Sequence, residues 1–66
     1  MKILLNGQAR DISDNITVDA LLHSLGFKPE ATVVERNTEI LDRSTYRDTV
    51  LADGDTVELV RFVGGG

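Results

Sequence analysis

The chain begins with a short apolar-rich run, Lys2–Leu5, that leads directly into the dipeptide Asn6-Gly7. Both residues of the dipeptide tolerate positive φ, so it predicts a two-residue hairpin turn after a first strand. The next segment, Gln8–Ile12, is more polar, and we expect it to be the return strand, exposed along one face. Residues 13–15 are Ser, Asp and Asn, a composition typical of a loop.

Apolar residues at helical spacing follow this loop. They lie at positions i, i+3, i+4 and i+7: Val18, Leu21, Leu22 and Leu25. The spacing predicts one amphipathic helix over residues 18–25. The Thr17 hydroxyl can cap its first N–H groups, and Asp19 complements the helix dipole in the first turn. Gly26 is placed to end the helix in a left-handed conformation, and Pro29 prevents the helix from resuming.

Runs of β-branched and apolar residues alternate with turn residues in the second half of the chain. Three further strands are expected, at Ala31–Arg36, at 39–41 and at Thr56–Phe62. Asn37 is a turn residue by type, and the polar stretch 43–48 predicts a single helical turn. The tripeptide Asp53-Gly54-Asp55 predicts a tight turn before the final strand.

The expected elements run in the order strand, strand, helix, strand, strand. This order predicts an α+β fold, in which one main helix covers one face of a mixed sheet of four to five strands. Sixty-six residues leave no room for a second domain, so residues 1–66 are expected to form a single domain. One face of the sheet is then left without cover.

Strand alternation identifies residues on this uncovered face. If Glu58 faces water, Val60 and Phe62 share its face, and in the first strand Lys2 places Leu4 outside in the same way. If the first and last strands are neighbours, Leu4, Val60 and Phe62 form an exposed apolar cluster, the kind of surface that contacts partner proteins. The alternative is that these are ordinary scattered surface residues.

Charge and composition exclude several classes of function. Eleven acidic residues against seven basic ones give a formal net charge of −4 at pH 7, which argues against nucleic-acid binding. No segment is long enough to span a bilayer or to serve as a signal peptide, so we expect a cytoplasmic protein with no membrane contact. The chain has no cysteine, so it has neither disulfides nor thiolate metal ligands, and it cannot carry a group as a thioester or persulfide on its own side chains.

The sequence contains no recognisable set of catalytic or metal-ligating side chains. His23 is the sole histidine and has no second ligand to complete a site. Asp53 and Asp55 flank a glycine but lack the further ligands of a calcium loop, and Tyr46 is expected to pack in the core or at its rim. The serines lack an activating motif; they are Ser13, Ser24 and Ser44. We therefore expect a substrate or subunit rather than an enzyme, with no catalytic residue and no metal.

Val63 and then three glycines follow the final strand, at Gly64, Gly65 and Gly66. Without Cβ atoms, residues 64–66 can form a flexible tail that enters a narrow channel in a partner protein. In this interpretation Gly64 and Gly65 bind in the channel, and the α-carboxylate of Gly66 is the reactive group. A frayed, passive terminus is the alternative.

Segments spread along the whole chain match one known family. They are Met1-Lys2-Ile3-Leu4-Leu5-Asn6-Gly7, Thr17-Val18-Asp19-Ala20-Leu21-Leu22, Val33-Val34-Glu35-Arg36-Asn37, Arg43-Ser44 with Tyr46, Asp53-Gly54-Asp55-Thr56-Val57-Glu58-Leu59-Val60, and Phe62-Val63-Gly64-Gly65-Gly66. In these segments the chain resembles the ThiS family, the small sulfur carriers of thiamin biosynthesis, which have the ubiquitin-like β-grasp fold. A Gly-Gly ending is common to all β-grasp carriers and modifiers, whereas the short length and the Val-Gly-Gly-Gly ending favour the thiamin branch.

The resemblance implies a role for the last glycine. An E1-like adenylyltransferase (ThiF-type) uses ATP and magnesium to adenylate the Gly66 carboxylate. Sulfur from a cysteine desulfurase relay then replaces the adenylate and gives a thiocarboxylate. A thiazole synthase (ThiG-type) accepts this sulfur during thiazole formation. The chain itself is implied to bind no cofactor, since ATP and magnesium are used by the activating enzyme.

Other functions remain open at this point. The small subunit of molybdopterin synthase also ends in Gly-Gly, and carriers for cysteine synthesis or tRNA thiolation use the same chemistry. A ubiquitin-like modifier would join Gly66 to a target lysine through an amide bond. A plain interaction domain with an inert tail is the third class.

Overall fold

The computed structural model describes residues 1–62. Within this range the strands are β1 (Lys2–Leu5), β2 (Gln8–Asp11), β3 (Thr32–Arg36), β4 (Glu39–Ile40) and β5 (Thr56–Arg61). The helical segments are α1 (Val18–Ser24) and two 3₁₀ turns, η1 (Pro29–Ala31) and η2 (Arg43–Thr45). Every expected element is present, and its ends lie within a few residues of those predicted.

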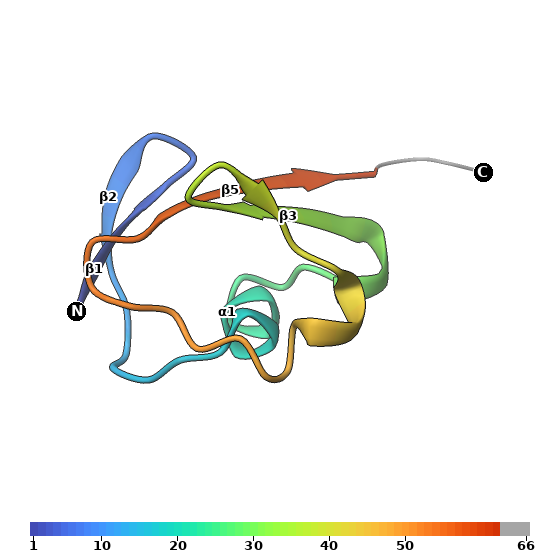
Figure 1. Ribbon diagram of the computed structural model, residues 1–66, viewed down its shortest axis with the longest axis horizontal. Helices are drawn as coiled ribbons and strands as arrows, with labels where there is room; N and C mark the ends of the chain where they lie inside the picture. Colours follow the sequence, from blue (N-terminus) through green and yellow to red (C-terminus); the bar gives the residue numbers. More distant parts are fainter. Residues whose placement is uncertain (63–66) are drawn as a thin grey trace.

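The strands of the described chain form one mixed sheet in the order β2-β1-β5-β3-β4. β5 pairs in parallel with β1 and antiparallel with β3, so the first and last strands are neighbours. The β1–β2 and β3–β4 pairs are antiparallel hairpins. Helix α1 lies across one face of the sheet (Figure 1). The expected α+β class, with one covered and one open sheet face, is confirmed.

The hairpin turn between β1 and β2 also supports β5. Asn6 and Gly7 have φ values of 48° and 83°, the paired positive values that the dipeptide predicted. The Asn6 backbone N–H donates to the Val57 carbonyl at 2.9 Å. Its side-chain oxygen accepts a hydrogen bond from the Leu59 N–H at 2.8 Å. The Asn6 side chain therefore continues the contact with β5 beyond the end of β1.

Both ends of α1 are capped as the sequence predicted. The Thr17 hydroxyl accepts a hydrogen bond from the Ala20 N–H at 3.1 Å. At the other end Gly26 adopts φ +76°, and its N–H donates to the His23 carbonyl. The Phe27 N–H donates to the Leu22 carbonyl at 2.9 Å, which completes a Schellman motif. This motif fixes the direction in which the chain leaves the helix.

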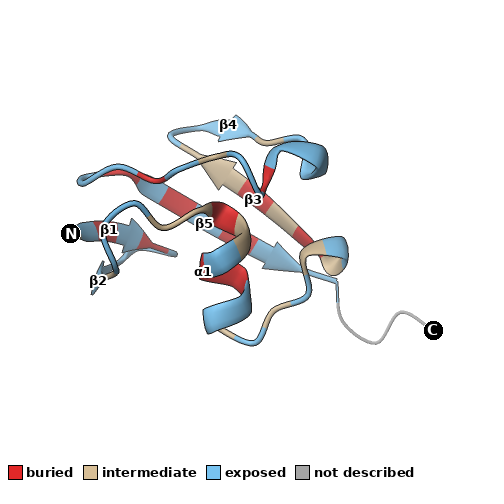
Figure 2. Ribbon diagram, turned by 90° about the horizontal axis from the view of Figure 1, so that it is seen from below, coloured by how far each residue is buried: buried red, intermediate tan, exposed pale blue. Residues whose placement is uncertain are grey.

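The hydrophobic core lies between α1 and the inner face of the sheet. The buried apolar side chains are Ile3, Leu5, Val18, Leu21, Leu22, Val34, Tyr46, Leu51, Val57 and Leu59. Figure 2 shows buried and exposed residues alternating along α1, in front of the sheet, as expected for an amphipathic helix. Alternation in β5 agrees with the sequence prediction, because Val57 and Leu59 are buried while Glu58 and Val60 are exposed.

Tyr46 is a core residue with a polar contact that the sequence did not reveal. Its ring is buried, as expected, and its hydroxyl donates to the Thr32 carbonyl at 2.8 Å. The acceptor is a backbone carbonyl fourteen residues away in the chain, so no side-chain motif in the sequence predicts this hydrogen bond. This bond joins the segment after η2 to the start of β3.

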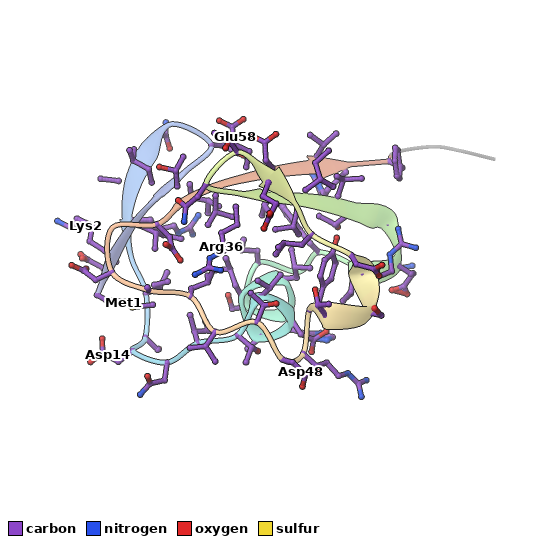
Figure 3. All side chains as sticks on the ribbon, in the orientation of Figure 1. Met1, Lys2, Asp14, Arg36, Asp48 and Glu58 are labelled. Carbon is purple, nitrogen blue, oxygen red and sulfur yellow. The ribbon has the colours of Figure 1, made fainter. Side chains whose placement is uncertain are left out.

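The turn before β5 contains a buried carboxylate. Gly54 has φ +87°, as the predicted tight turn requires. Asp55 accepts hydrogen bonds from the Ala52 N–H at 2.8 Å, the Arg36 Nε at 2.9 Å and the Asn37 amide at 3.0 Å. Figure 3 shows the Arg36 side chain pointing from the sheet toward the loop that precedes β5. Asp55 thus ties the start of β5 to the end of β3.

Candidate functional site

Strand β5 carries the chain toward the predicted reactive residues. It occupies the centre of the sheet, between β1 and β3. Phe62 is the last residue that the structure describes, one residue beyond the end of β5. Gly64 and Gly65, the predicted channel-binding residues, and Gly66, the predicted site of modification, lie outside the described residues. Their roles stay predictions.

The end of β5 is held mainly by β3. The β3–β5 ladder runs from the Arg36–Val57 pair to the Thr32–Arg61 pair. One further hydrogen bond, from the Phe62 N–H to the Ala31 carbonyl, measures 2.9 Å. The ladder between β1 and β5, by contrast, is confined to the first two residues of β5.

A contact between layers accompanies the last pair of this ladder. The Arg61 guanidinium carbon lies 4.1 Å from the centroid of the Phe27 ring, a cation–π geometry. Phe27 follows α1 directly and packs against the hydrophobic core. The contact therefore connects the end of β5 to the helical layer, in addition to its hydrogen bonds within the sheet.

The three residues predicted to lie on the outer face are all exposed. The exposed fractions are 44% for Leu4, 58% for Val60 and 63% for Phe62. Glu58, which set the alternation, points away from α1 in Figure 3. The orientation of β1 and β5 inferred from the sequence is therefore confirmed.

The expectation that these three residues form one cluster is wrong for Leu4. The register places Leu4 beside Thr56, at the start of β5. Val60 lies four residues further along the strand, which corresponds to ~13 Å. The short parallel pairing with β1 fixes this offset, and the polar side chains of Thr56 and Glu58 occupy the interval on the same face.

Val60 instead shares a shallow groove with side chains from β3 and β4. The groove is lined by Val33, Glu35, Ile40, Glu58 and Val60. Val33 pairs directly with Val60, and Ile40, which is 68% exposed, pairs with Glu35. We call these five residues the outer groove. Val33 and Ile40 were not predicted from the sequence, although Asn37 as a turn residue and strand alternation on either side of it could have placed both on this face.

The outer groove carries an unfavourable charge arrangement. Glu35 and Glu58 lie directly opposite each other on adjacent strands. Like charges directly opposite each other destabilise a sheet. The apolar residues of the groove therefore lie beside two carboxylates that a positively charged partner surface would stabilise.

Among residues 1–62, His23, Asp19 and Ser44 line one open pocket beside α1, together with Arg43 and Arg47. His23 lies 3.4 Å from Asp19 on the exposed side of α1. Ser24 donates to the Leu21 carbonyl, and Ser44 donates to the Asp42 carboxylate. Among residues 1–62 no three His, Asp or Glu side chains are grouped closely enough to hold a metal ion. None of the helices in this range has the length and apolar character needed to cross a membrane.

The chain is similar to proteins of one known family. Residues 3–66 match the model of the ThiS family. A thiazole synthase from Paramagnetospirillum magneticum is 46% identical over all 66 residues, and the chain spans 20% of the length of that protein. The sulfur carrier protein ThiS of Bacillus subtilis is 42% identical over 53 residues, which are 80% of this chain and 80% of that protein.

A solved structure agrees with the sequence relatives. The crystal structure of a thiamine biosynthesis protein (ThiS) from Geobacter metallireducens superposes with a TM-score of 0.85 at 35% identity, over the full length of both chains. This similarity confirms the β-grasp fold that the resemblance implied. The match of the family model, the Bacillus relative and the shared fold lead to one conclusion: the chain belongs to the ThiS family of sulfur carrier proteins.

Proposed function

We propose that this chain carries sulfur as a thiocarboxylate on Gly66 and donates it for thiazole formation in thiamin biosynthesis. The observation that carries the proposal is that the central strand β5 leads directly into Val63-Gly64-Gly65-Gly66 in a chain that matches the ThiS family through residue 66. In this proposal residues 1–66 act as one domain. Gly64 and Gly65 bind in the partner's channel and deliver Gly66.

The proposed chemistry begins with activation of a poor electrophile. A terminal carboxyl group has a pKa near ~3.5, so it is an anion at neutral pH and resists nucleophilic attack. A Gly66 carboxylate oxygen attacks the α-phosphorus of ATP on an E1-like, ThiF-type enzyme, and pyrophosphate leaves. A persulfide supplied by a cysteine desulfurase relay then displaces AMP, which departs with the carboxylate oxygen. A thiol cleaves the resulting acyl disulfide, so that the thiocarboxylate is released and the two cysteine sulfurs are oxidised to a disulfide. ATP and magnesium belong to the activating enzyme and not to this chain.

The outer groove is the proposed docking surface for the activating enzyme. It offers apolar contact through Val33, Ile40 and Val60, and its two opposed glutamates favour a partner with a basic rim. Phe62, two residues after Val60 in the chain, is proposed as a further contact on this sheet face. Leu4 lies apart and contributes a separate, peripheral contact.

The choice of acceptor rests on one comparison. The protein named a thiazole synthase matches all 66 residues of this chain, which favours a ThiG-type enzyme as the sulfur acceptor. Carriers for molybdopterin, cysteine or tRNA thiolation share the loading chemistry and differ in the acceptor. Transfer of labelled sulfur from the loaded carrier to a thiazole synthase distinguishes these possibilities.

Intact-mass measurement tests the proposed loading reaction. The purified chain is incubated with a ThiF-type enzyme, ATP, magnesium, a cysteine desulfurase, cysteine and a thiol reductant. We expect a mass increase equal to the exchange of one oxygen for one sulfur, localised to Gly66 by fragmentation. An unchanged carboxylate under these conditions would contradict the proposal, and Gly66 in amide linkage to lysine would instead support a protein modifier.

A further inference from the structure

The final residues of β5 need support from outside the sheet. Among residues 1–62, the pairing of β5 with β1 stops at Val57, and the Asn6 side chain holds the Leu59 N–H. Beyond Leu59 the backbone partners of β5 are on β3 and at Ala31. A strand end held along one edge opens at low free energy.

Arg61 supplies a second anchor at this strand end. By strand alternation it follows Val57 and Leu59 on the face that carries α1. Its guanidinium lies 4.1 Å from the Phe27 ring centroid. This contact crosses from the sheet to the helical layer, so it restrains β5 in a direction that the ladder with β3 does not.

The ring that receives Arg61 is itself firmly held. The Phe27 N–H is bonded to the Leu22 carbonyl in the helix cap, and the ring packs against the core. Further along the same segment, the Thr32 hydroxyl donates to the Lys28 carbonyl at 2.7 Å. The Thr32 carbonyl accepts from the Tyr46 hydroxyl at 2.8 Å. Residues 27–32 therefore form a fixed platform under the end of β5.

We propose that Arg61, stacked on Phe27, is a positioning residue for sulfur loading. The stacking fixes the point at which the chain leaves the sheet and hence the origin from which Gly66 reaches the activating enzyme; this inference rests on the proposed function. Release of Arg61 and Phe62 from β3 would add two residues, or ~7 Å of extended chain, between the sheet and Gly66. Since reaction rates depend steeply on placement of the reacting group, delivery should suffer while docking through the outer groove persists.

The test compares variants on both sides of the contact. Arg61→Ala removes the cation, Phe27→Leu removes the aromatic face, and Arg61→Lys keeps the charge. Arg10→Ala is the matched control, because it removes the same charge from the exposed edge strand β2. The readouts are kcat and KM for thiocarboxylate formation with a ThiF-type enzyme, and amide hydrogen exchange at Phe62.

A shared anchor makes the first two variants behave alike. We expect each to lower kcat by about three- to fivefold, the size of an exposed cation–π contact, with KM changed by less than about twofold. Exchange at Phe62 should accelerate by a similar factor. The double variant Arg61→Ala/Phe27→Leu should be no slower than either single variant, and Arg61→Lys should recover part of the rate.

Several results would overturn the positioning role. One is a kcat for Arg61→Ala equal to that of Arg10→Ala, and another is a wild-type kcat for Phe27→Leu. A third is a raised KM with unchanged kcat in Arg61→Ala, which would mean that Arg61 contacts the enzyme directly. A wild-type chain that accepts no sulfur would refute the proposed function and the positioning role with it. Faster exchange at Phe62 in Arg61→Ala would still establish the anchor in that case.

Discussion

Asp55 shows how one residue can be both buried and charged in this small protein. Its side chain is among the few buried polar groups of residues 1–62, with a residue exposure of 6%. Burial alone would raise the pKa of this carboxyl group. The hydrogen bonds from Ala52, Asn37 and Arg36, together with the positive charge of Arg36, outweigh burial and hold the pKa of Asp55 below its ordinary value of 3.8.

This shift predicts how stability depends on pH. Because the folded protein binds the Asp55 proton less tightly than the unfolded chain, the ionised carboxylate stabilises the fold. The contribution is complete well above pH 3.8 and is lost as the pH falls through the lowered, folded-state pKa. We expect Asp55→Asn to reduce the free energy of unfolding by about 2 kcal/mol at neutral pH and to flatten its acid dependence.

Urea unfolding between about pH 3 and pH 7 measures this effect. Asp48→Asn is the control, since it removes a carboxylate from an exposed position. Equal acid dependence in the two variants would show that Asp55 is not the group responsible.

At the scale of elements, strand alternation could be predicted from sequence and strand register could not. Glu58 was enough to assign both faces of β5. The alternation has a period of two residues, however, so it fits several registers that differ by an even number of residues. The observed register depends on contacts such as the Leu4 N–H to the Asp55 carbonyl at 2.9 Å, which join opposite ends of the chain. Without knowledge of these contacts, the sequence could not show that Leu4 and Val60 lie far apart on the same sheet face.

The same limit explains which site residues were missed. Ile40 joined the outer groove through a two-residue strand that the sequence suggested but did not orient. The Arg61–Phe27 contact joins two elements that are thirty-four positions apart and carry no shared motif. Helix caps, by contrast, depend on residues next to the helix in sequence, and Thr17 and Gly26 therefore predicted both ends of α1 correctly.

The register between β1 and β5 predicts different effects of substitution at Leu4 and Val60, two apolar residues on the same sheet face. Val60→Glu places a third carboxylate in the outer groove and should raise the KM of the activating enzyme about tenfold or more, because it buries a charge against an apolar contact. Leu4→Glu lies ~13 Å away and should change KM by less than about threefold. Both positions are exposed, so each variant should cost less than about 1 kcal/mol of stability.

Loading kinetics with a ThiF-type enzyme and urea unfolding provide the two measurements. Equal increases of KM in both variants would show that the docking surface includes Leu4. Loss of folding in Val60→Glu would show that the side chain is required for packing.

On the scale of the whole molecule, the fold and the proposed chemistry occupy separate parts of the chain. The buried core lies within residues 1–62, and the proposed reactive group lies at Gly66. The sequence predicted this division through the three glycines after the last strand and through the resemblance to the ThiS family, which implies a reactive group at Gly66. The proposed docking surface is formed by residues from three strands, so the sequence alone predicted only part of it.

The division predicts that truncation separates stability from function. Deletion of Gly65 and Gly66 should abolish thiocarboxylate formation while leaving the free energy of unfolding unchanged within about 0.5 kcal/mol. Mass spectrometry and urea unfolding of the same preparation test both halves of this expectation. Sulfur loading of the truncated chain would contradict the proposed role of Gly66.

The parallel pairing of β1 with β5 has a consequence for the order of events during protein synthesis. β1 is made before β5, the last strand in residues 1–62, yet the two strands are neighbours in the sheet. A sheet that pairs its first and last strands cannot be completed while the ribosome still holds the last one. The proposed docking surface includes Val60 of β5, so it too forms only after β5 has left the ribosome. An activating enzyme that recognises the folded sheet would therefore not bind a chain whose β5 is still unpaired on the ribosome.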